Sequence, residues 1–384
     1  MLPVTDKIKL LMLNYEFPPI GGGAGKANLC LLEEFAGMED LEIDVLTSSV
    51  ATGLSVEKFA DNITIYKVGI RKKNLHYWKK SEVITWLFKA YFQYRKMVKK
   101  NDYDLAHAFF GFPTGFLPWL TAAKLPYIIS LRGSDVPGYN IRLGLDYKLL
   151  GGLFSSIWHK ASAVIANSKG LTDLALKFTP DIDIGIIANG VSRDRFAPKP
   201  HNDYTDKLNL LTVCRLISRK RLHLLIEATA LLVEKGLDVT LNIAGEGNLM
   251  DELKSLAERL SVTNRVNFLG LIPSADMPAV YRENDVFVMC SSHEGMSNAM
   301  LEAMSSGLPL VTTRCEGVEE LICDNGIVVE KTDSISLAEA IDQIVGDVAK
   351  YQKMSQASIR QAERFTWKAS AMRYLELYLK TVEK

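Results

Sequence analysis

The sequence predicts an α/β protein with two domains, each built on a doubly wound parallel sheet. Short β-branched apolar runs occur in two series, separated by helical patterns such as "LHLLIEATALLVEKG". Runs that are apolar on both faces are typical of parallel strands covered by crossover helices. At 384 residues the chain exceeds what one hydrophobic core usually supports, so we expect two domains. The expected strands are 8–14, 43–48, 63–68, 105–110, 127–133, 163–167 and 184–189, then 208–214, 239–245, 266–270, 286–290, 308–313 and 327–330.

The domain boundary is expected between the two series of strands. The polar stretch "RDRFAPKPHNDYTDK" is the best linker candidate. We therefore expect an N-terminal domain over 1–192, a C-terminal domain over 193–366, and a helix over 367–384 that crosses back to the N-terminal domain. Ligands of such sheets bind beyond the carboxyl ends of the strands, so the two domains are expected to face each other across a cleft.

Charge and cysteine content exclude several classes of protein. Forty-five basic and forty-five acidic side chains leave no net charge, which argues against nucleic acid as a partner. The charge is uneven, with +4 in residues 1–190 and −4 in the remainder, so an anionic partner is expected in the first half. Five cysteines without a C-x-x-C pair indicate a reduced, cytoplasmic protein. We expect the start to form a first strand and not a signal peptide, and no stretch is apolar enough to span a membrane, so any membrane contact is expected to be peripheral, at the inner face.

A glycine-rich turn follows the first expected strand, in "EFPPIGGGAGKANL" at residues 16–29. It does not fit the Walker loop, because Ile20 stands where the first glycine belongs and Ala27 lacks a hydroxyl. The dinucleotide fingerprint fails as well. Glycines before a helix still allow close approach of an anion to backbone amides, so the turn predicts a phosphate contact. A tight turn without a ligand remains the alternative.

A basic cluster follows the first strand of the second series, in "RLISRKRLHLL". We expect Ser218 to cap a helix whose first turn holds Arg219, Lys220 and Arg221, with Arg215 just outside. Cations at a helix N-terminus oppose the macrodipole, each by about 0.3–1 kcal/mol. A bound polyphosphate would offset this unfavourable interaction. The alternative is that the long side chains bend into solvent and form no binding site.

A second helix start, in "HEGMSNAMLEAMSSGLP", carries two carboxylates. Ser297 is a good N-cap, Glu294 precedes the helix, and Glu302 lies about one turn inside it. Carboxylates beside a phosphate site must contact neutral groups, and sugar hydroxyls are the obvious partners. The alternative is a capping role for Glu294 and an exposed position for Glu302. Together with the basic cluster, these residues predict a nucleotide-sugar site.

The chain also resembles a known family. The resemblance is carried by the segments "EFPPIGGGAGKANLCLL", "LRGSDV", "VIANSKGL", "IIANGVSRDRF", "LTVCRLISRKRLHLLIEA", "LNIAGEGNLMDEL", "RVNFLGLI", "EGMSNAMLEAMSSGLPLVTT" and "EGVEELI". They are similar to segments of the retaining glycosyltransferases of family 4, which have the GT-B fold. The similar segments span nearly the whole chain and occur in the same order as in the family. The element from Glu294 to Glu302 is its most specific part.

The resemblance implies a role for each matching residue. Arg215, Lys220 and Glu294 are the expected catalytic residues: the two cations would bind the donor's diphosphate and Glu294 would lie beside the transferred sugar. Glu302 would hold the ribose hydroxyls. The other implied substrate-binding positions are Gly295, Met296, Ser297 and Asn298 for phosphate and sugar, Gly245, Gly247, Leu271 and Ile272 around the nucleoside, and Gly22 and Gly23 on the acceptor-side domain.

Departures from the family pattern concern the acceptor side. His107 is present, but Phe109 replaces the second histidine of the family's His-x-His element. Arg132 stands where a histidine is common, and we expect it to bind phosphate or an anionic acceptor with Asp135 orienting it. His107 is assigned to the substrate site, with a satisfied core position as the alternative. These changes leave the acceptor and details of catalysis open.

The implied reaction is metal-independent transfer with retention at the anomeric carbon, without a cofactor. The donor would be a nucleoside diphosphate sugar, with UDP favoured over GDP, and the acceptor a glycan or a lipid-linked sugar in polysaccharide or glycolipid synthesis. Arginine, lysine and helix dipoles would supply the charge that magnesium supplies elsewhere. A nucleotide-sugar epimerase of similar fold and an inactive nucleotide-sugar-binding protein remain as alternatives.

Residues 71–100 combine ten basic side chains with the aromatic residues Trp78, Trp86, Phe88 and Phe92 and one acid, Glu82. This pattern predicts peripheral contact with an anionic bilayer. The alternative is an ordinary core-facing helix with a solvated basic face. Its core stripe would comprise Val83, Leu87, Ala90, Tyr94 and Val98.

Overall fold

The computed structural model describes residues 7–72, 74–75, 77–139, 144–198 and 207–383. The chain forms two compact units, one of residues 1–189 with 367–384 and one of residues 190–366. The first unit thus ends at Asn189, three residues before the expected limit of 192. Much of the expected linker lies outside the described residues, which include its beginning up to residue 198.

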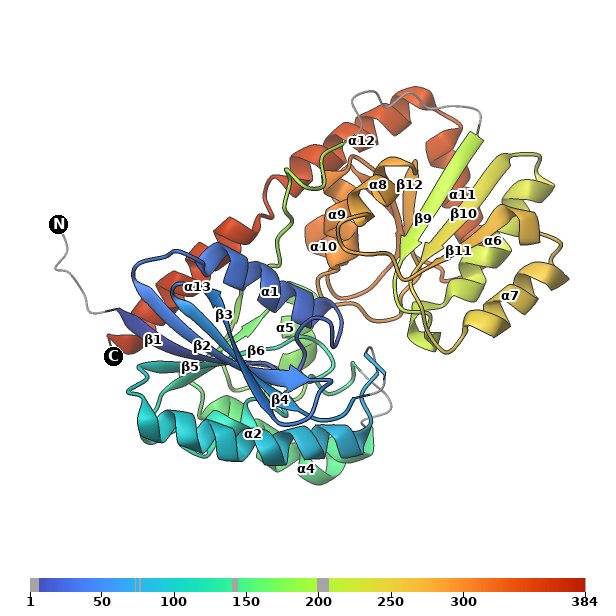
Figure 1. Cartoon of the computed structure of the whole chain (residues 1–384). Helices are drawn as coiled ribbons and strands as arrows, with labels where there is room; N and C mark the ends of the chain where they lie inside the picture. Colours follow the sequence, from blue (N-terminus) through green and yellow to red (C-terminus); the bar gives the residue numbers. More distant parts are fainter. Residues whose placement is uncertain (1–6, 73, 76, 140–143, 199–206, 384) are drawn as a thin grey trace. The chain divides into compact units, whose positions relative to one another are not determined.

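The first unit contains an 8-stranded sheet in the order β3-β4-β2-β1-β5-β6-β7-β8 (Figure 1). Its central strand β1 is buried at all but one position, because it is covered on both faces. Every expected strand of the first series is present. The bounds are β1 Ile8–Leu13, β2 Leu41–Ser49, β3 Leu54–Ala60, β4 Ile63–Gly69, β5 Leu105–Phe109, β6 Tyr127–Ser130, β7 Ala163–Ala166 and β8 Ile184–Ile186.

Strand β3 is the one strand of this sheet that the sequence reading did not predict. It pairs with β4 in the antiparallel sense at the sheet edge, whereas the other pairings of this sheet are parallel. Its first five residues are exposed. Charged side chains and a short length are typical of edge strands, so β3 lacks the apolar run that marks a buried strand.

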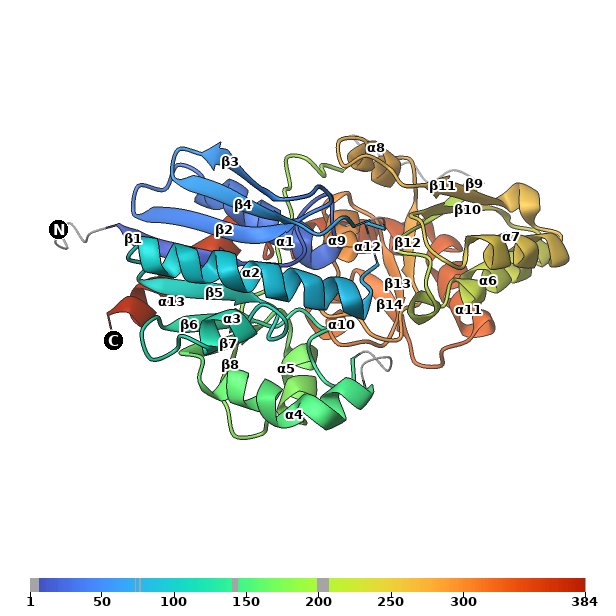
Figure 2. The ribbon, with the colours of Figure 1, turned by 60° about the horizontal axis from the view of Figure 1, so that its bottom comes forward.

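Six helices of the first unit surround this sheet in the described residues. Figures 1 and 2 show α2 along one face of the sheet, with α4 beside it. The bounds are α1 Gly23–Phe35, α2 Lys80–Lys100, α3 Phe116–Trp119, α4 Gly144–His159, α5 Lys169–Leu176 and α13 Trp367–Val382. None of the helices in the described part of the chain combines the length and the apolarity that crossing a membrane requires.

The helix α13 belongs to the first unit, although the whole second unit separates it in sequence from the rest. It packs against α1, and the rings of Phe35 and Tyr378 lie 6.0 Å apart. Trp367, Tyr374 and Tyr378 are buried members of the first unit's core. This core is therefore complete only when α13 is in place.

The second unit contains a 6-stranded parallel sheet in the order β11-β10-β9-β12-β13-β14. The chain builds outward from β9 to β11 and then continues on the other side with β12, so the strand order reverses between β9 and β12. All strands of the second series are present. The bounds are β9 Lys207–Val213, β10 Asp238–Ala244, β11 Val266–Gly270, β12 Val286–Met289, β13 Leu310–Thr313 and β14 Gly326–Val329.

Helices cover both faces of this second sheet. Buried leucines, isoleucines and valines of the strands and of α6 and α11 form one core cluster. The bounds are α6 Leu222–Glu234, α7 Met250–Arg259, α8 Met277–Arg282, α9 Asn298–Ser305, α10 Val318–Leu321, α11 Ser334–Val345 and α12 Val348–Ala362. A strand order that reverses in such a sheet places a ligand-binding crevice at the carboxyl ends of the strands.

The aromatic residues of 71–100 divide between core and surface. Trp86, which the sequence reading grouped with membrane-facing aromatics, is fully buried, so that assignment is wrong. Trp78 is half-buried, with its ring 4.8 Å from the ring of Tyr15. Phe88 and Phe92 are exposed. The buried stripe of α2 comprises Trp86, Ala90, Tyr94 and Met97, and the expected stripe residues Val83, Leu87 and Val98 border it.

Two neighbouring aromatic residues of α2 provide a stability test of this division. Trp86→Ala should lower the free energy of unfolding of the first unit by about 3–5 kcal/mol, because it leaves a cavity in the core. Phe88→Ala removes a ring that is 65% exposed and should stay within about 0.5 kcal/mol of the parent. Urea denaturation followed by circular dichroism measures both. Equal losses in the two variants would contradict the orientation of α2.

Candidate functional site

The candidate site of the second unit lies at the carboxyl edge of its sheet, around the point where the strand order reverses. The segments after β9, β10, β11 and β12 carry most of the residues that the sequence predicts for a site. In the described part of the chain, no group of three or more His, Cys, Asp and Glu side chains is arranged to hold a metal ion.

The basic cluster differs in local structure from the prediction. Ser218–Lys220 form a 3-10 turn, and α6 begins only at Leu222. Ser218 makes no capping bond for α6, and Arg221, with φ 48°, occupies the N-cap position in the left-handed conformation. Ser218 is therefore not the cap, and the cations lie in the turn before α6 instead of in its first turn.

Lys220 and Glu294 form an ion pair across this edge, from the segments after β9 and β12. Both side chains are largely buried, with 10% and 19% of their surfaces exposed. Burial by itself would raise the pKa of Glu294, but Lys220, Arg219 and Arg215 outweigh it and hold that pKa below its usual value. The site is thus a carboxylate held ionised by three cations, and the cations are in turn partly neutralised.

Backbone hydrogen bonds fix this pair in place. The Ser292 amide donates to the Arg219 carbonyl over 2.9 Å, which ties the segment after β12 to the basic turn. The Glu294 amide donates to the Glu316 carboxylate over 2.8 Å, and the Gly317 amide donates to the Glu294 carbonyl over 3.1 Å. A Cβ atom on Gly317 would overlap the carbonyl of Gly295, so the two loops are in direct backbone contact.

Glu316 is a residue that the sequence reading did not select. Besides the Glu294 amide, its carboxylate bonds to Nδ1 of His293 over 2.6 Å. Glu316 thereby positions the loop that carries Glu294. The segment "EGVEELI" that contains it was part of the family resemblance, but no single-residue signal in it indicated this role.

The helix α9 begins as predicted. The Ser297 hydroxyl accepts from the Met300 amide over 3.3 Å, which confirms Ser297 as the N-cap. Gly295, Met296 and Ser297 are buried, and Asn298 is half-buried at the first position of α9. The start of α9 thus lies directly beside Glu294 in the chain.

Glu302 is buried, not exposed as the alternative reading held, with 5% of its surface accessible. Its Oε2 atom accepts from the Tyr281 hydroxyl over 2.9 Å. Burial and then the charge of Glu302 hold the pKa of Tyr281 well above its usual value, so this hydroxyl stays a donor. Tyr281, on α8, was missed because a single tyrosine in "MPAVYR" resembles any core residue.

The segments after β10 and β11 contain the other expected positions. Gly245 has φ 134°, and a Cβ atom there would overlap the Cys214 carbonyl. A Cβ atom on Gly247 would overlap the Leu216 carbonyl. These two glycines therefore allow the segment after β10 to pass close to the one that carries Arg215. Leu271, 56% exposed, and the half-buried Ile272 directly follow β11.

The glycine-rich turn of the first unit leads from β1 into α1, as predicted. Gly22 is the N-cap of α1 and Gly23 its first residue. The Gly22 amide donates to the Glu16 carboxylate over 3.3 Å. An anionic group thus already stands at the turn where the sequence predicts a phosphate contact.

His107 is a core residue, which corrects its assignment to the substrate site. It is fully buried in β5, and its ring nitrogens bond to the Tyr378 hydroxyl and the Ser130 hydroxyl, each over 2.7 Å. Burial and the charge of Arg132 hold the pKa of His107 well below its usual value, so the ring is neutral. Sequence alone could not show this, because Tyr378 is contributed by α13.

Arg132 and Phe109, two departures from the family pattern, contact each other. The Arg132 guanidinium lies 4.4 Å from the centre of the Phe109 ring. It donates to Oδ1 of Asn189 over 3.0 Å and to the Tyr374 hydroxyl over 3.2 Å. Phe109, which replaces the second histidine of the family pattern, thus makes a cation–π contact with Arg132.

Asp135 contacts the backbone of Arg132 and not its guanidinium, which corrects the predicted orienting role. The carboxylate accepts from the amides of Gly111 and Arg132 over 2.7 and 2.9 Å. Burial raises the pKa of Asp135 to about 6, although these bonds and the Arg132 charge act in the opposite direction. Asp135 therefore holds together the segments that follow β5 and β6.

The ion pair of the second unit generates a pH-dependent prediction. Glu294→Gln should lower the free energy of unfolding at pH 7 by about 1–3 kcal/mol, because it removes a charge-assisted hydrogen bond. The pKa of Glu294 is lowered in the folded state, so its stabilisation is present above the usual value of 4.5 and is lost as the pH falls through the folded value.

The difference between parent and variant should therefore be constant from neutral pH to about pH 5 and shrink below the unfolded pKa. Urea denaturation over this range measures it. Glu363→Gln, which breaks the exposed pair with Arg193, is the control and should have no measurable effect. A Glu294→Gln difference that persists unchanged in acid would contradict the assigned ion pair.

Two family models match consecutive parts of the chain. The model described as Glycosyltransferase Family 4 matches residues 21–195, and the model described as Glycosyl transferases group 1 matches residues 194–361. The second match covers the whole edge described above, from the basic turn to Glu316.

Curated relatives include a full-length match. An uncharacterized glycosyltransferase of Methanocaldococcus jannaschii is 24% identical over 404 residues, covering 97% of this chain and 98% of the relative. The lipopolysaccharide core biosynthesis glycosyltransferase LpsE of Rhizobium meliloti is 34% identical over 197 residues, which is 50% of this chain and 56% of LpsE.

Solved structures resemble the chain over its full length. Sucrose-phosphate synthase of Thermosynechococcus elongatus has a TM-score of 0.82 at 19% identity, covering 97% of this chain and 99% of that one. HepE of Anabaena, solved with UDP and glucose, has a TM-score of 0.72 at 21% identity, covering 97% and 100%. With both family models and this fold, the chain belongs to the group 1 glycosyltransferases of family 4, which have the GT-B fold.

Proposed function

We propose that this glycosyltransferase moves a sugar from a nucleoside diphosphate sugar to a glycan or a lipid-linked acceptor, with retention and without a metal ion. The observation that carries the proposal is the cluster of Arg215, Arg219 and Lys220 around the ionised Glu294 at the carboxyl edge of the second sheet. A diphosphate matches this charge, and a sugar hydroxyl matches the carboxylate.

The positive charge of the site supports a diphosphate leaving group. Lys220 is 10% exposed and pairs with Glu294. When a diphosphate binds, Lys220 and Arg215 bond to its oxygens and stabilise the charge that develops as it departs. The amides that precede and begin α9 add the partial positive charge of a helix N-terminus. Together these groups perform the role that a divalent ion has in other transferases.

The two glutamates support recognition of neutral hydroxyls. Glu302 is buried and already fixed by Tyr281, so it offers a rigid carboxylate to the ribose. Glu294 is held ionised and bonds to a hydroxyl of the transferred sugar. Because Glu316 and Gly317 fix the backbone of Glu294, this contact is positioned before the donor arrives.

The transfer that fits these groups proceeds on one face of the sugar. The bond between the anomeric carbon and the phosphate oxygen breaks, and the acceptor oxygen bonds to the same carbon from the same side. The acceptor proton passes to an oxygen of the departing diphosphate. Configuration is therefore retained without a protein nucleophile, in contrast to the paired carboxylates of retaining glycosidases.

The donor base and the acceptor are inferred from relatives. HepE has been solved with UDP, so we favour UDP and keep GDP as the second donor base to test. LpsE acts in lipopolysaccharide core synthesis, which supports a lipid-linked or glycan acceptor.

Activity should depend on Lys220. Lys220→Ala should lower kcat by about 10²–10³-fold, because one donor to the developing negative charge is lost. Release of nucleoside diphosphate from UDP- and GDP-sugars, measured with and without EDTA and with candidate acceptors, tests this. EDTA should leave the rate unchanged.

The matched control is Lys235→Ala, an exposed lysine at the end of α6 that pairs with Asp342. It should retain parent activity. Normal turnover by Lys220→Ala, or a requirement for a divalent ion, would overturn the proposed site. Conversion of the donor sugar without an acceptor and without diphosphate release would instead indicate an epimerase.

Glu302 should recognise the ribose. UDP should bind Glu302→Gln about 10–100-fold more weakly than the parent, as expected for a lost hydrogen bond to a charged group. A nucleotide lacking the 2′-hydroxyl should bind the parent more weakly than UDP does, and the variant should discriminate less between the two. Isothermal titration calorimetry measures all four affinities.

Tyr281→Phe is the control for a merely structural effect. It removes the bond to Oε2 of Glu302 but leaves the carboxylate, so discrimination between the two nucleotides should persist. Equal discrimination by the parent and Glu302→Gln would contradict the assignment of Glu302 to the ribose.

A further inference from the structure

The outer face of α2 carries an exposed apolar stripe. Ile84, Phe88 and Phe92 are spaced four residues apart, so they lie on one side of the helix. They are 66%, 65% and 57% exposed. Single exposed apolar residues are ordinary, but a stripe of three large ones indicates an interaction surface.

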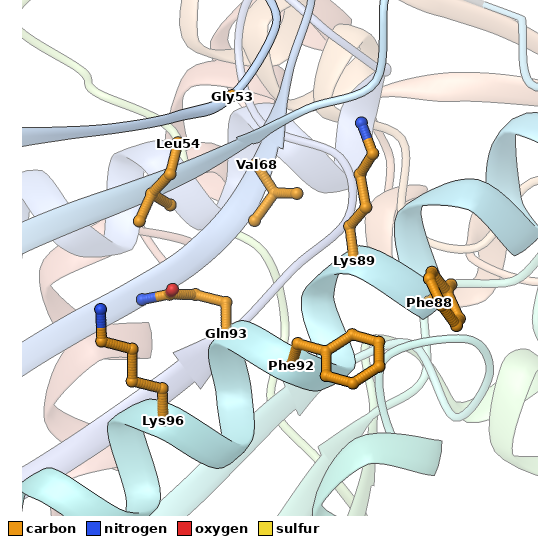
Figure 3. A pocket seen from close by; sticks show the side chains of 8 residues that line it. All are labelled: Gly53, Leu54, Val68, Phe88, Lys89, Phe92, Gln93 and Lys96. Carbon is orange, nitrogen blue, oxygen red and sulfur yellow. The ribbon is translucent and has the colours of Figure 1, made fainter.

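The stripe borders a groove between α2 and the edge of the first sheet (Figure 3). The groove has a volume of about 380 Å³ and is formed by Phe88, Phe92, Leu54 and Val68, among others. The rings of Phe88 and Phe92 meet edge to face, with centres 5.0 Å apart. On β3, Leu54 and Val56 are 46% and 54% exposed and lie on one face of the strand, which extends the apolar surface.

Lysines surround this apolar surface. Lys89 and Lys96 belong to the groove lining, and Lys89 donates to the Gly69 carbonyl over 2.7 Å. The helix α2 carries six basic side chains and one acidic side chain, Glu82. Glu82 is already paired with the buried Lys72 over 2.9 Å. Among the described residues, no carboxylate forms an ion pair with Lys89, Lys96, Lys99 or Lys100.

The neighbouring helix α4 continues the pattern. The Lys80–Asp146 ion pair, at 2.7 Å, ties the first turn of α2 to the first turn of α4. Leu145 and Leu149 on α4 are 73% and 82% exposed. Large exposed apolar side chains therefore occur on three adjoining elements of the first unit, β3, α2 and α4.

We propose that this surface docks the protein on an anionic lipid bilayer. The docking surface is defined by Ile84, Phe88, Phe92, Leu54 and Val56 with Lys89, Arg95 and Lys96. Apolar and aromatic side chains enter the boundary between headgroups and acyl chains, while basic side chains attract anionic lipids. The excess positive charge favours this occupant over a second copy of the chain, since two such surfaces would repel each other.

The surface is preformed. The opposite stripe of α2, formed by Trp86, Ala90, Tyr94 and Met97, is buried in the first unit's core. The helix therefore presents its outer face without having to fold on the membrane, and binding does not require the entropy loss of ordering a segment. The inference is independent of the proposed reaction, because docking needs no donor or acceptor.

Vesicle sedimentation of the full chain tests the proposal. The protein should bind vesicles of phosphatidylcholine mixed with phosphatidylglycerol, bind pure phosphatidylcholine far more weakly, and be released by high salt. Lys89→Glu with Lys96→Glu should reduce partitioning by about thirtyfold or more, given about 1 kcal/mol per basic residue. Phe88→Ser with Phe92→Ser should reduce it by about tenfold or more, through the lost apolar insertion.

Matched controls alter exposed residues elsewhere. Ile335→Ser with Val348→Ser removes two exposed apolar side chains of the second unit, and Lys353→Glu with Lys380→Glu reverses two exposed charges. Both controls should bind vesicles like the parent. Unchanged melting temperatures verify that all variants are folded.

Three results would overturn the proposal. One is no binding of the parent to anionic vesicles, and another is equal loss in the controls. A third is a dimer without lipid that Phe88→Ser with Phe92→Ser dissociates, which would assign the surface to a second copy of the chain. Turnover with a soluble acceptor, measured in parallel, separates failure of docking from failure of the proposed reaction.

Discussion

The candidate site depends on balancing positive charge that is gathered in a small volume. Three cations after β9 would repel one another if nothing opposed them, and Lys220 is largely buried. Glu294 supplies the opposing charge, and the backbone contacts through Ser292, Glu316 and Gly317 hold it there. A ligand that competes for the cations must therefore offer at least as much negative charge as a carboxylate. The proposed diphosphate would meet that condition and would leave Glu294 available to a neutral partner.

The strands were predictable because buried parallel strands leave short, β-branched apolar runs at regular intervals along the chain. The edge strand β3 was not predictable, because its exposed positions accept many residue types and produce no apolar run. The same limit applied to the turn at Ser218–Lys220. A serine before basic residues resembles a helix cap, but Arg221 adopts a left-handed conformation and α6 starts one turn later. The left-handed conformation of Arg221 could not be predicted, because no glycine or other residue type in that segment indicates it.

The site residues divide in the same way. The start of α9 follows a motif with fixed spacing, so the N-cap Ser297 and the places of Glu294 before the helix and Glu302 inside it could be predicted from sequence. Residues that act through tertiary contact, such as Tyr281 and Glu316, could not. His107 was misassigned because its hydrogen-bond partners come from β6 and α13. The contact between Arg132 and Phe109 shows that two substitutions, separate in sequence, form one local arrangement.

The position of α13 bears on how the protein is made. A ribosome completes residues 190–366 before it reaches Trp367–Val382, so the nascent first unit emerges without its last helix. Until then the ring of His107 lacks its Tyr378 partner, and the apolar face of α1 is uncovered. The second unit, whose segment is contiguous, can fold as soon as its own residues are synthesised, whereas the first cannot complete its core before Trp367–Val382 follows.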